Sequence, residues 1–572
     1  MAQTIRTSKS RTMPVAELPD VRPSATPAVP AKPARWRGAA LYAALFALYF
    51  GVGYLLTMRY NLFDPDATSR VANAGYVLES RDPHLSAVGF VWNPLPSLVE
   101  VPILQLSRWW PELRSHGMAG VVQSALLMSA AAMMVRGIAL DRRVGAGWRR
   151  LAVAAFAMQP MIVAYGASGM SEAAETFAVL WCVRHLMRWS EGRDPRDLAW
   201  AGLALATGYL ARYEVIAAAV GAGAFVTVAT MLDTRHSRLA RALADMAIVM
   251  FPIVVAAAVW ALSGWVVNQE LFAPITSQYG NATQVGIAIQ RGYLGAGGAS
   301  EWLPVAARMF GMQPFVGMAA AGAMAYAVLA RRPAVLVPVV IFGPVLAFAV
   351  WGQYTVTTFG WFRFYLLAIP LVVTVALGCW SPGRRWGIPQ RLGVAVLVAS
   401  IAVGFPVTVG AMLNERIGDP PLQAGLSSLL HPDRRPLQEV WQRRLLVNSR
   451  LLADYLDRQR LPDGAVLMDT AYTWSVWLSS SRPKQFVINS DYDFKATLNR
   501  PWEHDVQYLL VSNPKDNDAD ALSVRYATLW NDGAGMSRLV YSVDGPDGVE
   551  QFRLYRVTGP PRAVDSDRQG PL

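Results

Sequence analysis

Two aspartates and an arginine follow the first long apolar run of the sequence. Asp64 and Asp66 are separated by Pro65, and Arg70 lies four positions after Asp66. A carboxylate can act as a general base, and an arginine beside it can bind an anion. The alternative is that Asp64 or Asp66 only caps a helix that begins near Thr68. The spacing alone leaves both interpretations open.

Further charged residues lie where other apolar runs end. These candidates are Glu172, with Glu175 one turn on, Arg212, Glu214 and Arg363. Ionisable groups at membrane depth are costly, so each is a candidate for function. The planar guanidinium of arginine can engage a phosphate through two parallel hydrogen bonds. The alternative for each candidate is a purely structural role near a helix end, in which the side chain forms an ion pair or extends to the membrane surface.

The composition indicates that these residues are positioned by transmembrane helices. Of 572 residues, 53% are hydrophobic and only 16% are charged, which is too apolar for a soluble fold. Long apolar runs predict about eleven transmembrane helices. These runs lie at 38–58, 117–139, 151–166, 173–189, 198–211, 215–232, 246–267, 313–330, 334–352, 361–380 and 392–412.

Arginine-bearing loops predict the orientation of these spans. Arginines occur in the loops 141–150, 190–197, 233–241, 331–333 and 381–391. Because cytoplasmic loops are enriched in Lys and Arg, these five loops and a disordered tail at 1–36 are predicted to be cytoplasmic. The transmembrane part then spans 37–412, with a first outer loop at 59–116. All the candidate residues fall on the extracytoplasmic side.

The C-terminal part of the chain has a different pattern. Residues 413–562 predict a small extracytoplasmic α/β domain, followed by a loose tail at 563–572. An amphipathic helix is expected at 436–460. Short apolar segments separated by turn residues predict strands at 464–470, 485–491, 506–514, 536–543 and 550–557.

The net charge of +12 does not indicate a nucleic-acid partner. Residues 413–572 hold 19 Lys and Arg against 21 Asp and Glu, so the positive excess belongs to the tail and the inter-span loops. Such a distribution is a topology signal. Cys182 and Cys379 lie inside predicted spans and indicate neither a disulfide nor a metal site.

The first outer loop resembles that of the GT-C superfamily of integral-membrane glycosyltransferases. The resemblance is to the branch of protein mannosyltransferases and aminoarabinose transferases. It rests on Asp66-Ala67-Thr68-Ser69-Arg70, then a helix at 69–80, then Trp92-Asn93-Pro94-Leu95-Pro96. It implies a polyprenyl-phosphate sugar donor, an extracytoplasmic glycan, lipid or protein acceptor, and transfer with inversion. Asp66 or Asp64 would be the catalytic carboxylate, with Arg70, Arg212 and Arg363 as phosphate ligands.

Two departures from that pattern concern the site. Pro65 separates the acidic pair, and Asn93 stands where some relatives have a lysine for the lipid phosphate. The phosphate contact must then come from elsewhere. His84 and Trp92 are candidates for lining the acceptor path, with an interfacial anchor as the alternative for Trp92. No metal or other cofactor is expected to be required, although some members of the superfamily use a divalent metal.

Two rival functions remain open at this point. A transporter or flippase is disfavoured because the chain has no evident internal repeat and no charge in mid-span. The second rival function is that of a non-catalytic relative that acts as a binding scaffold. The Gly-rich segment 268–300, with Gln278, Tyr279, Arg291 and Tyr293, is a candidate lid over the site.

Overall fold

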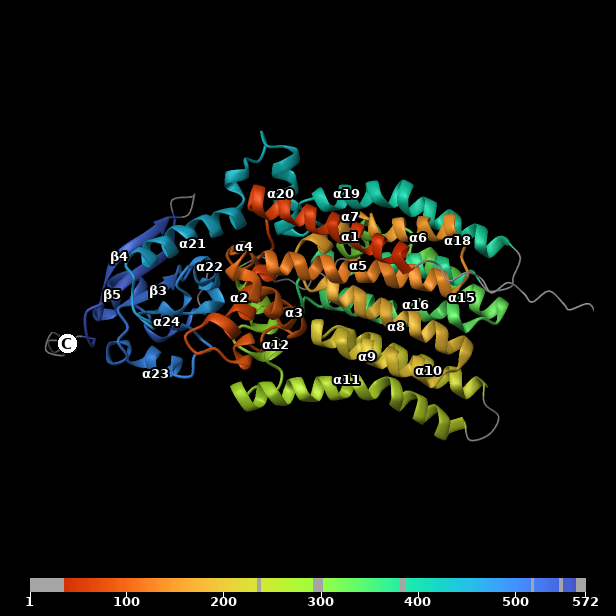
Figure 1. Ribbon diagram of the computed structural model, residues 1–572, viewed down its shortest axis with the longest axis horizontal. Coiled ribbons are helices and arrows are strands. Elements are labelled where there is room, and N and C mark those ends of the chain that lie inside the picture. The colour runs from red at the N-terminus through yellow and green to blue at the C-terminus, as the bar shows by residue number, and fades with distance from the viewer. Residues whose placement is uncertain are drawn as a thin grey trace, which may run out of the picture.

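The chain forms a long helical bundle with a smaller domain at one end. The computed structural model describes residues 35–233, 238–291, 302–380, 386–515, 519–544 and 549–561. Figure 1 shows the bundle lying lengthwise and the C-terminal domain, in blue, at its left end. The predicted tails at 1–36 and 563–572 lie almost wholly outside the described residues.

Helical segments occupy every apolar run that the sequence predicts. They are α1 (Arg35–Tyr54) with a π-helical turn (Leu55–Arg59), α5 (Met118–Asp141), α6 (Ala146–Ala157), α7 (Pro160–Ala167), α8 (Glu172–Gly192), α9 (Pro195–Ala211), α10 (Val215–Asp233), α11 (Arg238–Asn268), α14 (Trp302–Met312), α15 (Val316–Ala330), α16 (Val337–Tyr354), α17 (Ala368–Gly378), α18 (Ile388–Ala399) and α19 (Phe405–Leu413). By length and composition, six described spans can cross a membrane, or eight if two bent pairs each count as one. The chain is a multi-pass membrane protein, and the number eleven stays a prediction.

One predicted span, 151–166, is broken into α6 and α7, and the helix α15 in the predicted span 313–330 follows an additional helix, α14, at a sharp angle. α6 and α7 meet at 62°, and α14 and α15 meet at 78°. At the first bend, Pro160 begins a new helix, and the side chain of Gln159 accepts hydrogen bonds from the backbone N–H groups of Met161 (2.7 Å) and Ile162 (3.2 Å). A capped break of this kind is typical of a helix start at proline.

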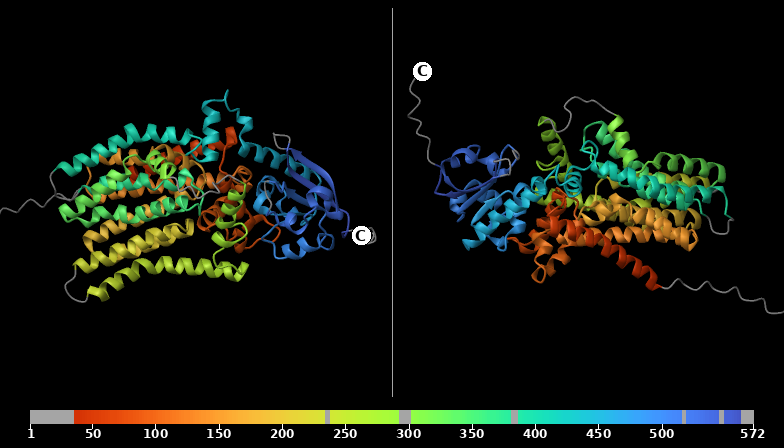
Figure 2. Two further views of the ribbon diagram at one scale, coloured as in Figure 1. Left: turned by 180° about the vertical axis from the view of Figure 1, so that it is seen from behind. Right: turned by 90° about the horizontal axis from the view of Figure 1, so that it is seen from above.

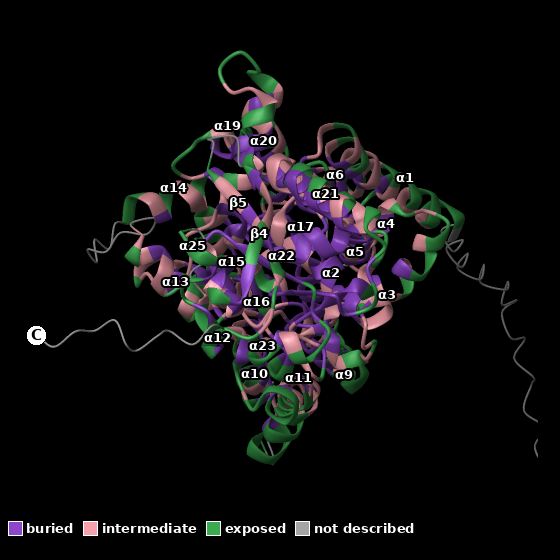
Figure 3. Ribbon diagram, turned by 90° about the vertical axis from the view of Figure 1, so that its left-hand side faces the viewer, coloured by how far each residue is buried: buried purple, intermediate pink, exposed green. Residues whose placement is uncertain are grey.

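Helices differ strongly in how far they are buried. In α5, 67% of the most apolar stretch is buried within the protein, against 17% in α1 and in α11. Figure 3 shows buried residues gathered around α2, α5 and α17, with exposed residues on outlying helices such as α11. The outlying helices therefore present their apolar faces to lipid.

The first loop forms short helices between the bundle and the C-terminal domain. They are α2 (Pro65–Glu79), α3 (Leu95–Leu104) and α4 (Glu112–Ser115). Figures 1 and 2 both place this orange-red segment at the junction of the two parts. α2 begins earlier than predicted, because Asp64 caps it and Pro65 occupies its first turn.

The C-terminal part contains the predicted helix and strands. After α20 (Pro420–Leu430) comes α21 (Trp441–Arg458), and the strands are β1 (Val466–Met468), β2 (Phe486–Val487), β3 (Tyr508–Ser512), β4 (Ser537–Asp544) and β5 (Glu550–Val557). The sheet order is β2-β1-β3-β5-β4. β1 pairs in parallel with β2 and β3, whereas β5 runs antiparallel to β3 and β4.

The C-terminal domain shares one hydrophobic core with α2. Val71 and Tyr76 of α2 are buried in the same cluster as Val466 and Trp477 of the C-terminal domain. The rings of Tyr76 and Trp477 meet edge to face, with their centroids 4.6 Å apart. One face of α2 is therefore fixed by the C-terminal domain.

Candidate active site

Asp64 both caps a helix and takes part in an ion pair. Its Oδ1 accepts a hydrogen bond from the backbone N–H of Asp66 at 3.0 Å, and its Oδ2 lies 3.3 Å from Nη1 of Arg363. The capping interpretation is therefore confirmed for Asp64, and its second carboxylate oxygen is engaged by an arginine. The cap fixes the direction in which the carboxylate points.

Arg363 contacts two segments that are distant from it in the sequence, the first loop and the start of α8. It lies in a 3₁₀ turn (Phe362–Tyr365) before α17, and its side chain is 4% exposed. Its Nη2 lies 2.8 Å from Oδ2 of Asp66, and its Nε lies 3.3 Å from Oε1 of Glu172. Its guanidinium also covers the ring of Trp361 at 3.7 Å. One arginine thus bridges the first loop and the start of α8.

Arg212 extends this network on the side of α9. Its guanidinium pairs with Glu172 at 2.8 Å, Glu214 at 2.7 Å and Glu175 at 3.3 Å. Glu172 is therefore shared by Arg212 and Arg363. The structure brings together most of the candidates predicted from the sequence.

Arg70 lies beside this network and is largely buried. Its guanidinium covers the ring of Trp92 at 4.4 Å, and Nη1 donates to the backbone carbonyl of Asp66 at 3.3 Å. Burial lowers the pKa of Arg70, while Asp66 and Glu172 act in the opposite direction. Asn93 donates a hydrogen bond to the backbone carbonyl of Tyr209, so it anchors the first loop to α9.

The electrostatic setting of Asp64 suits a proton acceptor. Burial raises its pKa to about 7, although Arg363 opposes this rise. A base works best when its pKa is close to the working pH. Asp64 therefore has the ionisation behaviour that a general base needs.

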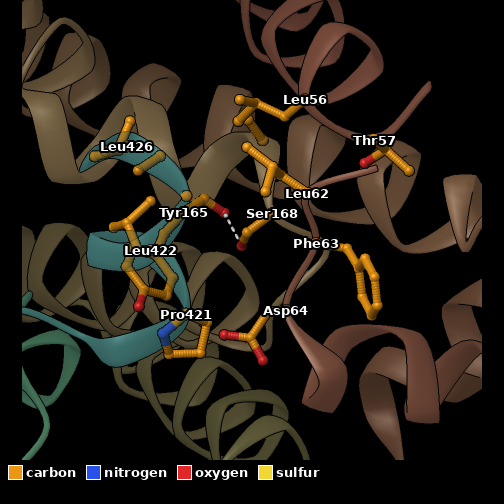
Figure 4. A pocket seen from close by; sticks show the side chains of 13 residues that line it. Leu56, Thr57, Leu62, Phe63, Asp64, Tyr165, Ser168, Pro421, Leu422 and Leu426 are labelled. Atoms are coloured by element: carbon orange, nitrogen blue, oxygen red, sulfur yellow. Dashed lines mark hydrogen bonds between the residues drawn. The ribbon is translucent and has the colours of Figure 1, made fainter. Parts of the chain in front are cut away.

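Two cavities border the network. The first is an apolar groove that ends on Asp64, with Leu62, Tyr165, Pro421 and Leu422 among its walls. Figure 4 shows Asp64 and these side chains around the groove. The second cavity is lined by the charged residues Glu175, Arg212, Glu214 and Arg363, together with aromatic and apolar side chains. Asp64 therefore lines a mainly apolar cavity, and Arg212 and Arg363 line a charged one.

Two buried acidic residues near the network, Asp419 and Glu100, are not among the candidates predicted from the sequence. Asp419 accepts hydrogen bonds from Tyr165 and from the backbone of Arg363. Glu100 of α3 is fully buried, and no described residue donates a hydrogen bond to its carboxylate. Burial raises the pKa of Glu100 well above its usual range. The only signal for Asp419 was the following Pro420-Pro421, which indicates a helix cap and no more.

Of two further predicted features, His84 lies away from the network, whereas the segment 268–300 contacts the border of the charged cavity: Asn281 donates to the backbone carbonyl of Thr357 at 2.9 Å, next to Thr358 in the cavity wall. The ring of His84 stacks on Tyr492 of the C-terminal domain, with centroids 4.5 Å apart, beyond the far end of α2 from Asp64. In the segment 268–300, Tyr279 donates to Asp469 of the C-terminal domain at 2.7 Å. Residues 292–301, which include Tyr293, lie outside the described residues.

Among the described residues, one acidic group could share a metal ion. Asp82, Asp491 and Asp493 lie close together where the first loop meets the C-terminal domain. Arg81 pairs with all three carboxylates, so their charge is already partly neutralised. This group lies at the opposite end of α2 from Asp64.

Comparison with known proteins gives a fold likeness at low identity. No family model matches the sequence, and no curated protein sequence matches it. ArnT from Cupriavidus metallidurans bound to undecaprenyl phosphate aligns with a TM-score of 0.48 and 14% identity, over 92% of this chain and 98% of that chain. The apo state of ArnT from the same organism gives 0.47 and 15%, with the same coverage of both chains.

Proposed function

We propose that this chain is a membrane glycosyltransferase that moves a sugar from a polyprenyl-phosphate donor to an extracytoplasmic hydroxyl group. The observation that carries the proposal is the position of Arg363, which contacts Asp64, Asp66 and Glu172 at 3.3, 2.8 and 3.3 Å. A base and an anion-binding group therefore meet at the junction of the helical bundle and the first loop.

The proposed reaction is a direct displacement at the anomeric carbon. Asp64 removes the proton of the acceptor hydroxyl, whose oxygen bonds to the anomeric carbon as the bond to the phosphate oxygen breaks. The configuration is inverted, and the polyprenyl phosphate leaves with the bonding electrons. Asp66 is the alternative base, and its side chain is 26% exposed against 12% for Asp64.

The two arginines stabilise the departing phosphate in this mechanism. Arg212 and Arg363 both line the charged cavity. Preorganised guanidinium groups in a buried site are effective at stabilising developing negative charge. The proposed mechanism assigns stabilisation of the leaving group to these two arginines and not to a divalent metal, so EDTA is expected to leave transfer unchanged.

Donor binding would also release the base. The N–H groups of Arg363 are directed at Asp64, Asp66 and Glu172. A phosphate that enters the charged cavity competes for the same guanidinium. As Arg363 turns toward the phosphate, Asp64 loses its ion pair and becomes free to accept a proton.

The positions of the loops support extracytoplasmic chemistry. The turns before α8, between α9 and α10, and before α17 carry the network, and α2 lies beside the C-terminal domain. The arginine-rich loops 141–150 and 190–197 lie at the other ends of α5 and α8. The positive-inside tendency supports an extracytoplasmic position for the network.

Asparagine substitutions of the two aspartates test the proposal. Asp64→Asn keeps a good helix cap, so it removes the base while preserving α2. In proteoliposomes with lipid-linked sugar donors, we expect sugar transfer to fall by about 10²- to 10⁴-fold, with donor binding retained. Asp66→Asn identifies which carboxylate is the base.

The matched control is Asp194→Asn, which changes an exposed N-cap aspartate of α9. Transfer by this variant should equal that of the wild type. A transporter or a binding scaffold would keep its activity in Asp64→Asn and Asp66→Asn alike. That result, or a wild type that transfers no sugar from any lipid-linked donor, would refute the proposed function.

A further inference from the structure

Asp419 is a buried acid placed at a helix start that it does not cap. It directly precedes Pro420, the first residue of α20, and its side chain makes no capping hydrogen bond. Asp64 and Asp194, in the same position before a proline-led helix, both accept a hydrogen bond from their own helix. The carboxylate of Asp419 is therefore used elsewhere.

Both oxygens of Asp419 accept hydrogen bonds from distant elements. Oδ1 accepts from the backbone N–H of Arg363 at 3.2 Å, and Oδ2 accepts from the hydroxyl of Tyr165 at 2.6 Å. Asp419 is 2% exposed and Tyr165 is 3% exposed. Hydrogen bonds to a buried carboxylate are strong, so this bridge between α7, the Arg363 turn and α20 is stiff.

The Arg363 turn needs such a bridge. Residues 355–361 before the turn form no helix or strand, and α17 begins only at Ala368. The N–H of Arg363 lies at the start of a 3₁₀ turn, where a donor lacks a partner within the turn. Asp419 supplies that partner and thus caps the turn from another element.

We infer that Asp419 is a positioning residue that fixes the backbone of Arg363, so that its guanidinium can serve both the carboxylates and the donor phosphate. This inference rests on the proposed function. It also links the apolar groove to the network. Tyr165 and the first turns of α20 form groove walls around Asp64 (Figure 4), and Asp419 joins both walls to Arg363.

The primary test is Asp419→Asn. An asparagine has no charge and replaces one of the two acceptor oxygens by a donor, so the charge-assisted hydrogen bonds from Arg363 and Tyr165 are weakened. We expect kcat to fall by about 10- to 100-fold because the guanidinium is misplaced. The KM for the acceptor should stay close to that of the wild type. Tyr165→Phe removes one donor only and should give a smaller loss.

The control and the double variant separate positioning from folding. Asp194→Asn makes the same chemical change at the start of α9 and should leave kcat unchanged. In an Arg363→Ala background, Asp419→Asn should cause little further loss, because residues that act as a unit are not additive. An unchanged kcat in folded Asp419→Asn, or a full additional loss in that background, would overturn the inference.

Amide hydrogen exchange tests the bridge without any assay of transfer. The amide of Arg363 should exchange faster in Asp419→Asn than in the wild type, and Asp194→Asn should not change it. Equal exchange in all three proteins would contradict the bridge. If the wild type transfers no sugar, the proposed function fails, and exchange at Arg363 alone decides whether Asp419 holds the turn.

Discussion

Asp64 is the residue whose ionisation should control the reaction. Its carboxylate is held by a backbone hydrogen bond from Asp66 and by Arg363, yet it is buried enough for its pKa to rise to about 7. Desolvation disfavours the charged form of an acid, and here it outweighs the nearby cation. Asp64 is therefore expected to exchange its proton close to neutral pH.

This behaviour predicts the pH dependence of transfer. A general base works only when it is deprotonated, so kcat/KM should rise as the pH increases from 6 to 8, with a midpoint near 7. The profile should be measured in proteoliposomes with the internal and external pH equal. If kcat/KM of the wild type is flat across this range, Asp64 is not the base.

At the scale of elements, α2 connects the chemistry to the C-terminal domain. Its first residues carry Asp66 and Arg70, and its far half packs on Trp477. A Cβ atom at Gly75 would lie 2.7 Å from Cζ3 of Trp477, which is too close for a carbon contact. The absence of a side chain at Gly75 thus allows the helix and the domain to approach.

Gly75→Ala should therefore loosen α2. We expect a loss of about 1–3 kcal/mol in stability from overpacking, with a parallel fall in transfer. Thermal unfolding in detergent and a transfer assay measure the two effects. Gly51→Ala is the matched control, because a Cβ there meets nothing within 4 Å. Equal effects of the two substitutions would show that the contact with Trp477 is unimportant.

The sequence predicts elements well and their contacts poorly. Long apolar runs predicted the helices, and short alternating segments such as 506–514 predicted the strands. Both predictions succeed because these patterns depend only on neighbouring residues. Asp64 and Arg363 are 299 positions apart in the sequence, so no local pattern predicts that they form a pair. The candidates were found by their charge near helix ends, whereas Asp419 was missed because Asp-Pro-Pro looks like an ordinary cap.

The whole molecule has two ends with opposite chemical character. The C-terminal domain, the first loop and the arginine–carboxylate network are at one end, and the arginine-rich loops 141–150 and 190–197 are at the other. The C-terminal domain shares its core with α2, so we expect it to brace the site. This arrangement makes the orientation in the membrane a requirement of the proposed chemistry.

Thiol labelling of intact cells tests this orientation. Asp463 is exposed in the C-terminal domain, and Gly145 is exposed in a predicted cytoplasmic loop. With a membrane-impermeant reagent, Asp463→Cys should be labelled directly and Gly145→Cys only after permeabilisation. The wild type gives the background, since Cys182 is buried and Cys379 is partly buried. The reverse pattern would place the network in the cytoplasm and exclude the proposed donor.

The lipids that co-purify with two variants test the central claim most directly. Asp64→Asn lacks the base but keeps the arginines, so it should retain an intact sugar-linked polyprenyl phosphate that mass spectrometry can identify. Arg363→Ala should lose most of this lipid, because its phosphate ligand is gone. If neither variant carries a polyprenyl phosphate, or if both carry it equally, the assignment of the donor site to Arg363 is wrong.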